Sequence, residues 1–287
     1  MLDTSLTEES SLRIAYLDCF AGISGDMFLG AILNAGVPPG VLQDAIAALG
    51  LGASLKTETV DRSGISCTKV HVCEGDSAAE AHTSNHHHKP HTHTHAGSQP
   101  RPHVHGRSLS AIRTMIDVAP LPEPVKQTAI GTFELLGQAE SRIHNVSMEE
   151  IHFHEAGAVD AIVDIVGASA GIHFLQIAAW HCSPLNVGGG MVVCAHGTFP
   201  VPAPATADLL RGFPTYSAHV QQELVTPTGA ALLRALDPTF GQQPAMKVEQ
   251  IGYGAGTRNP KDFPNALRLS IGESFDVPDF HCRKDRD

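Results

Sequence analysis

A histidine-rich segment divides this chain of 287 residues into two parts. Nine of the eighteen histidines lie between His82 and His105, in HTSNHHHKPHTHTHAGSQPRPHVH, where Val104 is the only branched aliphatic residue. Such a sequence cannot bury enough apolar surface to offset the entropy of ordering it. We therefore expect two folded lobes, at residues 1–80 and 107–272, joined by a disordered histidine-rich loop at 81–106 and followed by a polar tail at 273–287.

The same segment is rich in potential metal ligands. Neutral imidazole binds nickel, zinc, copper and cobalt, and the absence of cysteine between Cys73 and Cys182 removes the thiolates that favour zinc-finger or Cu(I) chemistry. A flexible linker that binds metal only adventitiously has the same composition. We expect metal recruitment here, through His86, His87, His88, His91, His93, His95, His103 and His105.

Composition excludes several classes of partner. The formal net charge of −11 argues against nucleic acid and anionic membrane surfaces, which require a clustered cationic face. The six cysteines form no C-x-x-C pair, which favours reduced thiols. The first residues, MLDTSLTEESSLR, are polar and acidic where a secretory signal needs a basic start and an apolar core. We expect a cytoplasmic protein.

Hydrophobic periodicity predicts a mixed α+β fold. Apolar runs and alternation predict strands near 13–20, 177–185, 189–196, 246–256 and 265–272, and a hairpin that turns at Ser63 and Gly64. Helical spacing, with proline or threonine at several starts, predicts helices near 21–36, 38–50, 108–117, 122–144, 157–175, 200–212 and 226–236. Because helices and strands do not alternate strictly, the class is α+β or irregular α/β.

The run IHFHEAGAVDAIVD concentrates metal ligands at a predicted strand-to-helix junction. In an extended chain His152 and His154 point to the same side, while Asp160 and Asp164 share one face of the following helix. Two imidazoles and one or two carboxylates would make a site for Ni, Zn, Mn or Fe with open positions. The alternative is that these are satisfied structural groups, with Asp160 favoured by the helix dipole.

The sequence DCFAGISGDM predicts a second site at the end of the first strand. Gly22 and Gly25 could expose backbone N–H groups to a phosphate at the helix N-terminus, or Asp18 and Asp26 could hold a metal. The motif is neither a P-loop nor a Rossmann fingerprint, and glycines in a tight strand–helix turn need no ligand.

Further polar residues are weaker candidates. His196 could be a metal ligand or proton carrier, and the helix start with Thr226 and Thr228 could bind an anion. We interpret a second group as structural or core residues: His144, His173, His181, His219, Cys19 and Cys194.

Several long motifs together resemble the LarC family of nickel-insertion proteins. They run in order from Ile14 to about Gly272: YLDCFAGISGDMFLGAIL, VHGRSLSAIRTMI, IHFHEAGAVDAIVDIVGA, CSPLNVGGG, HGTFPVPAPAT, ELVTPTGAALL and GYGAGTRNP. The resemblance implies insertion of Ni²⁺ into pyridinium-3,5-bisthiocarboxylic acid mononucleotide, giving the nickel-pincer nucleotide cofactor of lactate racemase. It also implies CTP with Mg²⁺ or Mn²⁺, a racemase-type apoprotein as acceptor, and a possible homo-oligomer.

The implied reaction suggests roles for individual residues. A base must remove a ring proton as the Ni–C bond forms, and imidazoles can both deliver nickel and accept that proton, so His152, His154 and Glu155 are the catalytic candidates. The loop residues Asp18, Gly22, Gly25 and Asp26, with Thr226 and Thr228, are the candidates for binding the nucleotides.

The resemblance is to the N-terminal part of the family. Full-length members continue into a C-terminal domain associated with CTP binding, and the tail GESFDVPDFHCRKDRD does not resemble it. We therefore expect turnover to need that domain. The alternatives are a non-enzymatic nickel chaperone or store, and a metallohydrolase built on His152, His154 and an aspartate.

Overall fold

The computed structural model describes residues 11–74, 77–78, 107–153, 158–194 and 197–275. Its helices are α1 (Gly25–Asn34), α2 (Pro39–Ala47), α3 (Leu109–Val118), α4 (Glu123–His144), α5 (Val159–Leu175), α6 (Pro204–Leu209) and α7 (Pro227–Leu236), with a short 3-10 turn at Met148–Glu150. Its strands are β1 (Arg13–Asp18), β2 (Ala53–Arg62), β3 (Ile65–Glu74), β4 (Ser77–Ala78), β5 (Ala179–Cys182), β6 (Leu185–Asn186), β7 (Met191–Cys194), β8 (Gly197–Pro200), β9 (Thr215–Tyr216), β10 (Thr239–Phe240), β11 (Met246–Ala255) and β12 (Ala266–Ser274). The histidine-rich segment lies outside the described residues.

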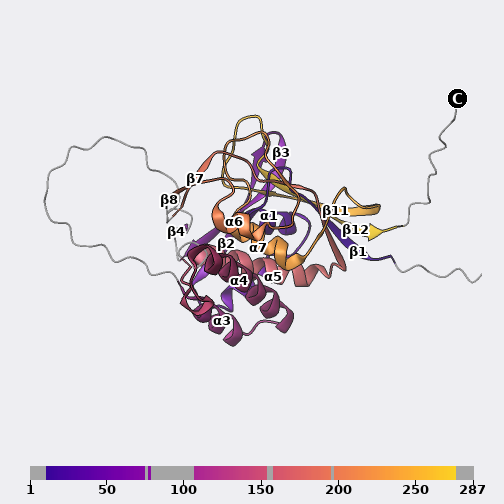
Figure 1. Cartoon of the computed structure of the whole chain (residues 1–287). Coiled ribbons are helices and arrows are strands. Elements are labelled where there is room, and N and C mark those ends of the chain that lie inside the picture. The colour runs from indigo at the N-terminus through magenta and orange to yellow at the C-terminus, as the bar shows by residue number, and fades with distance from the viewer. Residues whose placement is uncertain (1–10, 75–76, 79–106, 154–157, 195–196, 276–287) are drawn as a thin grey trace, which may run out of the picture.

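One mixed sheet organises the molecule. Its strands follow the order β10-β5-β1-β12-β11-β3-β2, and β4 pairs with β3. Strand β1 runs parallel to β5 and antiparallel to β12. The mixed α+β class is confirmed. Strands from before and after the histidine-rich segment lie side by side, so the two predicted lobes share this sheet (Figure 1).

The long hairpin of β2 and β3 is confirmed where the sequence predicts it. Arg62 pairs with Ile65, and the two residues between them, Ser63 and Gly64, have φ values of 52° and 87°. Positive φ at both central residues gives the primed type of turn, whose twist matches that of the flanking strands.

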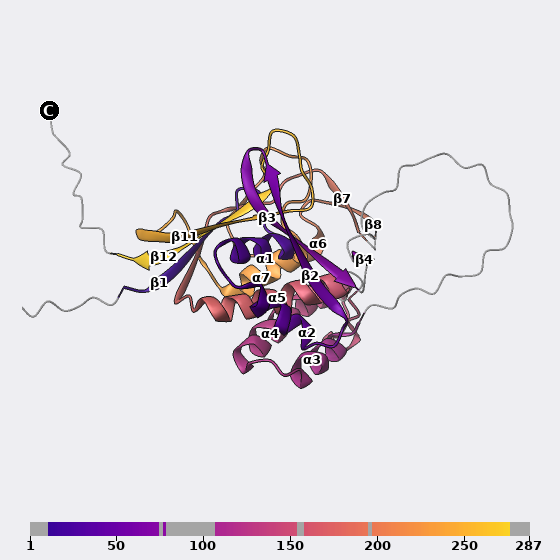
Figure 2. The ribbon, with the colours of Figure 1, turned by 180° about the vertical axis from the view of Figure 1, so that it is seen from behind.

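The helices collect on one side of the sheet, as both ribbon views show (Figures 1 and 2). Helix α1 packs on β11 and β3, and α5 lies among α1, α2, α4 and α7. Ile162, Ile165 and Val166 of α5 are fully buried. A helix that is apolar on nearly every side belongs in the interior, which is where α5 lies. No helix within the described ranges is both long and apolar enough to cross a membrane.

The other side of the sheet has a small apolar cluster of its own. In β1, Ala15 and Leu17 belong to the main core, whereas Ile14 and Tyr16 pack with Met246 on the opposite side. Because successive side chains of a strand alternate between faces, Asp18 follows Tyr16 onto the side away from the helices.

Candidate functional site

The loop after β1 is held against the segment that precedes α7. Ile23 N donates to Leu224 O at 3.0 Å, and Thr226 N donates to Ile23 O at 3.1 Å. Gly22 has a φ of 73°, and a Cβ there would lie 2.1 Å from Leu224 O. This close approach requires glycine and brings the starts of α1 and α7 together. Two segments that lie about 200 positions apart in the sequence are therefore neighbours.

The start of α7 is capped by its own threonine. The Thr226 Oγ1 accepts a hydrogen bond from Gly229 N at 3.2 Å. Proline follows at the first helical position, where a missing N–H costs nothing. The cap explains Thr226 structurally, and Thr228 lies half-buried within the first turn.

Asp164 of α5 reaches the start of α1. A Cβ on Gly25 would lie 2.3 Å from the Oδ2 atom of Asp164, so only glycine leaves room for this carboxylate. Asp160 lies one turn earlier on α5 and is half-buried. We call the loop from Cys19 to Gly25 the glycine loop. Helix α5, predicted as part of a metal site, thus contacts this loop, which the sequence predicts as a second site.

Asp26 binds several groups that the sequence analysis did not connect. Its carboxylate pairs with Lys69 Nζ at 2.6 Å and accepts hydrogen bonds from the hydroxyl groups of Ser24 and Thr257. Lys69, on β3, has a side chain that is only 3% exposed, and it also donates to Thr257 Oγ1 at 2.9 Å. This network ties α1, β3 and the end of β11 together. No spacing rule links residues so far apart in the sequence.

Asp18 does not join Asp26. It forms an ion pair with Arg268 across the β1–β12 pairing. Burial by itself lowers the pKa of Arg268, but the hydrogen bond to Tyr253 and the charge of Asp18 raise it overall. Asp18 therefore belongs to a second polar group, on the side of the sheet away from the helices.

The chain that follows the histidine-rich segment pairs with the run that contains His152. Ser108 forms an antiparallel bridge with His152, and Phe153 N donates to Arg107 O at 3.1 Å. Ile151 and Phe153 are buried, whereas His152 is exposed. The alternation places His152 outward from a fixed backbone, next to the point where the histidine-rich segment rejoins the described chain.

The remaining predicted ligands lie outside the described residues. These are His154, Glu155, His196 and the histidines from His86 to His105. Among the described residues, no three His, Cys, Asp or Glu side chains come close enough together to hold a metal ion. His152, Asp160 and Asp164 thus contribute to a region and form no complete ligand set by themselves.

The two cysteines interpreted as core residues differ. Cys19 is fully buried, with its Sγ 3.6 Å from that of Cys182. The hydrogen bond to Cys182, together with burial, raises the pKa of Cys19, which keeps it a thiol. This part of the prediction is confirmed. Cys194, at the end of β7, is half-exposed, so its assignment to the core is wrong.

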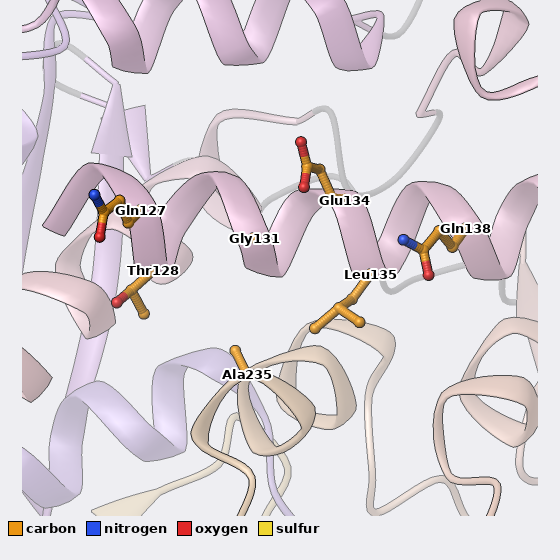
Figure 3. Close-up of a pocket in the computed structure, with 7 residues that line it drawn as sticks. All are labelled: Gln127, Thr128, Gly131, Glu134, Leu135, Gln138 and Ala235. Atoms are coloured by element: carbon orange, nitrogen blue, oxygen red, sulfur yellow. The ribbon is translucent and has the colours of Figure 1, made fainter. Parts of the chain in front are cut away.

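A shallow depression of about 310 Å³ lies elsewhere, between α4 and α7. Figure 3 shows its lining: Gln127, Thr128, Gly131, Glu134, Leu135, Gln138 and Ala235. Glu134 forms an ion pair with Arg113 at 3.1 Å. The depression holds no predicted site residue, and its polar groups do not suggest a reaction.

The chain resembles known proteins over nearly its whole length. The family described as nickel insertion protein matches residues 15–284. A pyridinium-3,5-bisthiocarboxylic acid mononucleotide nickel insertion protein of Desulfitobacterium hafniense is 44% identical over 266 residues, covering 92% of this chain and 60% of the relative. Proteins of the same name from Geobacillus kaustophilus and Thermotoga sp. are 43% and 42% identical, each over 91% of this chain and 60% and 61% of their own lengths.

The chain thus spans about 60% of the length of the curated relatives it matches. No solved structure matches it significantly. The family match runs from within β1 to beyond β12 and contains both the glycine loop and the His152–Asp164 region. On this evidence, the chain belongs to the nickel insertion protein family.

Proposed function

We propose that this chain handles nickel for insertion into pyridinium-3,5-bisthiocarboxylic acid mononucleotide, the compound that appears in the names of its relatives. The product would be the nickel-pincer nucleotide, for a lactate racemase-type acceptor. The observation that carries the proposal is the pairing of Arg107 and Ser108 with Phe153 and His152, with Asp164 of the next helix against the glycine loop. The candidate ligand His152 thus lies beside the end of the histidine-rich segment, and the candidate ligand Asp164 lies against the glycine loop, which supports the proposal.

The chemistry of insertion fits the residue types. Ni²⁺ would form two bonds to the thiocarboxylate sulfurs and one to a ring carbon, which loses its proton. Imidazole suits nickel, and a neutral imidazole can accept that proton. We assign delivery of nickel to the histidine-rich segment, and proton transfer at the ring to His152, His154 or Glu155. Asp160 and Asp164 would supply the nearby negative charge that favours a cation.

The test is nickel binding and insertion by variants of the two histidines. We expect His154→Ala, and to a lesser degree His152→Ala, to reduce insertion strongly while leaving the unfolding midpoint almost unchanged, because His152 is exposed. His173→Ala, an exposed histidine near the other end of α5, is the matched control. Normal nickel insertion by both histidine variants would remove the proposed site.

We also propose that turnover needs residues that the relatives have beyond the region matched here. A triphosphate is held by cationic side chains and by carboxylates that organise Mg²⁺. Near the glycine loop, Lys69 is paired with Asp26, and across the sheet Arg268 is paired with Asp18. The chain alone is expected to bind nickel but to bind CTP weakly and to release no CMP. Calorimetry with CTP and Mg²⁺ or Mn²⁺ tests this, and saturable micromolar binding would contradict it.

Nickel storage is the second candidate, and the nine histidines between His82 and His105 favour it. Stoichiometry separates the two functions. Several weak sites that disappear with the segment indicate storage, whereas one tight site that survives its removal indicates a centre for insertion.

A further inference from the structure

Partly exposed aromatic side chains lie around the end of β1, where Asp18 forms its ion pair with Arg268. Only 5% of the chain is Phe, Trp or Tyr. Four of these residues nevertheless lie here with one histidine, and we call the group the aromatic surface: Phe20, Tyr216, His219, Tyr253 and Phe263.

Contacts connect four of the five side chains, Phe20, Tyr253, Phe263 and His219. Phe20 and Tyr253 pack on the same small cluster of buried residues around Ala255 and Ala266. Phe263 meets Phe20 edge to face, with ring centroids 6.5 Å apart, and His219 stacks on Phe263 at 5.3 Å and 24°. Edge-to-face and stacked arrangements are the favourable ones for aromatic pairs.

The charged pair joins the surface at Tyr253. Arg268 is hydrogen-bonded to Tyr253 and to Asp18, and its side chain is still 41% exposed. Burial, followed by the charge of Asp18, raises the pKa of Tyr216. A guanidinium group therefore borders the aromatic rings with part of its surface open to a ligand.

Asn186 fixes the two loops that carry the rings. It is fully buried, its Nδ2 donates to Phe20 O at 2.9 Å and Ala218 O at 3.2 Å, and its Oδ1 accepts from Ala218 N at 3.1 Å. Its neighbour Val187 donates its N–H to Tyr216 O at 2.9 Å. His219 is held at a φ of 72°, in the left-handed region that such residues rarely adopt. These hydrogen bonds hold the backbone of both loops in place, and a binding surface requires residues that are held in this way.

We infer that the aromatic surface is an initial binding site for the pyridinium mononucleotide, with the ring against Phe263, His219 and neighbouring aromatics and an anionic group on Arg268. This assignment rests on the proposed function, which supplies the ligand. A pyridinium ring is flat and cationic, so aromatic faces attract it by stacking and by cation–π interaction. Its phosphate and thiocarboxylate groups are anionic, and arginine can bind such groups with two parallel hydrogen bonds.

The test uses nicotinic acid mononucleotide, a pyridinium mononucleotide with one carboxylate, titrated calorimetrically into the whole chain. We expect saturable binding, and a loss of roughly tenfold in affinity for Phe263→Leu and for Arg268→Gln, the change produced by about 1.4 kcal/mol. Tyr216→Leu should also weaken binding. Tyr216 is 41% exposed, so the Tyr216→Leu variant should fold. It therefore remains informative even if Arg268→Gln folds poorly because Asp18 has lost its ion-pair partner. Phe174→Leu, another aromatic residue that is 48% exposed, is the control and should bind normally.

Two further measurements make the result decisive. Uridine monophosphate has a phosphate and no cationic ring, so it should bind more weakly; equal affinity for both nucleotides overturns the assignment of the ring. Absence of binding to the pyridinium mononucleotide, or unchanged binding by Phe263→Leu and Tyr216→Leu, also overturns the inference. Nickel binding by these variants should remain normal. The nickel-handling proposal is judged separately, by the His152 and His154 variants, so the two can fail independently.

Discussion

Asp26 shows how a residue that looks like a ligand can be committed to the fold. Its carboxylate accepts hydrogen bonds from Ser24 and from its own neighbour Met27 N, and it pairs with the buried Lys69. A buried ammonium group is costly unless it is paired. The pair therefore fixes the start of α1 against β3, and with it the position of the glycine loop.

Replacing Asp26 by asparagine should destabilise the protein. The ammonium group of Lys69, on a side chain that is only 3% exposed, would lose its ion pair with the Asp26 carboxylate. Breaking a buried pair on one side costs about 3 kcal/mol or more, and we expect a loss of that order in urea unfolding. The double variant Asp26→Asn with Lys69→Met should recover part of the loss, because the buried ammonium group that Asp26 balances is removed as well. Surface substitutions usually change the free energy of unfolding by less than about 0.5 kcal/mol. A change that small for Asp26→Asn would contradict this prediction.

His181 should make stability depend on pH. It lies on β5 beside Tyr16, and burial lowers its pKa from the ordinary value of 6.5. The unfolded chain therefore binds the proton more readily than the folded one. The contribution of His181 to the free energy of unfolding is therefore fully present above its unfolded-state pKa of 6.5. This contribution is lost as the pH falls from there towards the lower pKa of the folded state.

The measurement is the free energy of unfolding between pH 5 and 7.5, roughly the range in which histidine titrates. His181→Gln should flatten the slope, whereas His173→Gln, at an exposed position, should leave it as it is. An unchanged slope for His181→Gln would assign the pH dependence to another group.

At the scale of elements, the glycines of β11 decide how closely α1 approaches the sheet. A Cβ on Gly254 would lie 1.8 Å from Met27 O, and one on Gly252 would lie 2.0 Å from Ala31 O. These are contacts with helix backbone, which cannot move aside as a side chain can. This packing explains the glycines of the GYGAG run.

Gly254→Ala should accordingly cost about 3 kcal/mol, at the upper end of the range for overpacking, because α1 must shift as a unit. Gly40→Ala is the matched control. Gly40 lies in α2 with no atom within 4 Å of its added Cβ, and alanine favours a helix. Thermal unfolding of both variants tests the difference, and equal melting temperatures would show that α1 accommodates the extra methyl group.

The elements themselves were largely predictable from the sequence. The β2–β3 hairpin, α1 and α7 follow from alternation, helical spacing and turn residues, which are local properties. The contacts of the site were not predictable. Asp164 against Gly25, and Lys69 with Asp26, join residues far apart in the chain, and they depend on how the helices pack on the sheet. Asn186 lies in CSPLNVGGG, one of the motifs that carry the family resemblance, but its role appears only when two loops meet at its side chain.

In the whole molecule, the parts of the chain before and after the histidine-rich segment are joined by strand pairing and by a shared core. Strand β1 pairs with β5 and β12, and β3 meets β11 where Thr68 lies beside Gly254. The main core also mixes residues from both sides, such as Leu17, Ile32, Ile165 and Leu269. The folded body is held together by these contacts, independently of the covalent link through residues 79–106.

Deleting residues 82–102 should therefore lower nickel capacity and leave the protein folded. The deletion removes seven of the nine histidines of the segment and no branched aliphatic residue, so little apolar burial is lost. The flanking pairings, β4 with β3 and Ser108 with His152, remain in the shortened chain. Nickel stoichiometry and the melting temperature of the metal-free protein are the two measurements. Replacing the same residues by a glycine–serine linker of equal length is the control, since it removes the imidazoles but keeps the span. A large fall in melting temperature for both variants would show that the segment supports the fold, and an unchanged stoichiometry would show that its histidines do not hold nickel.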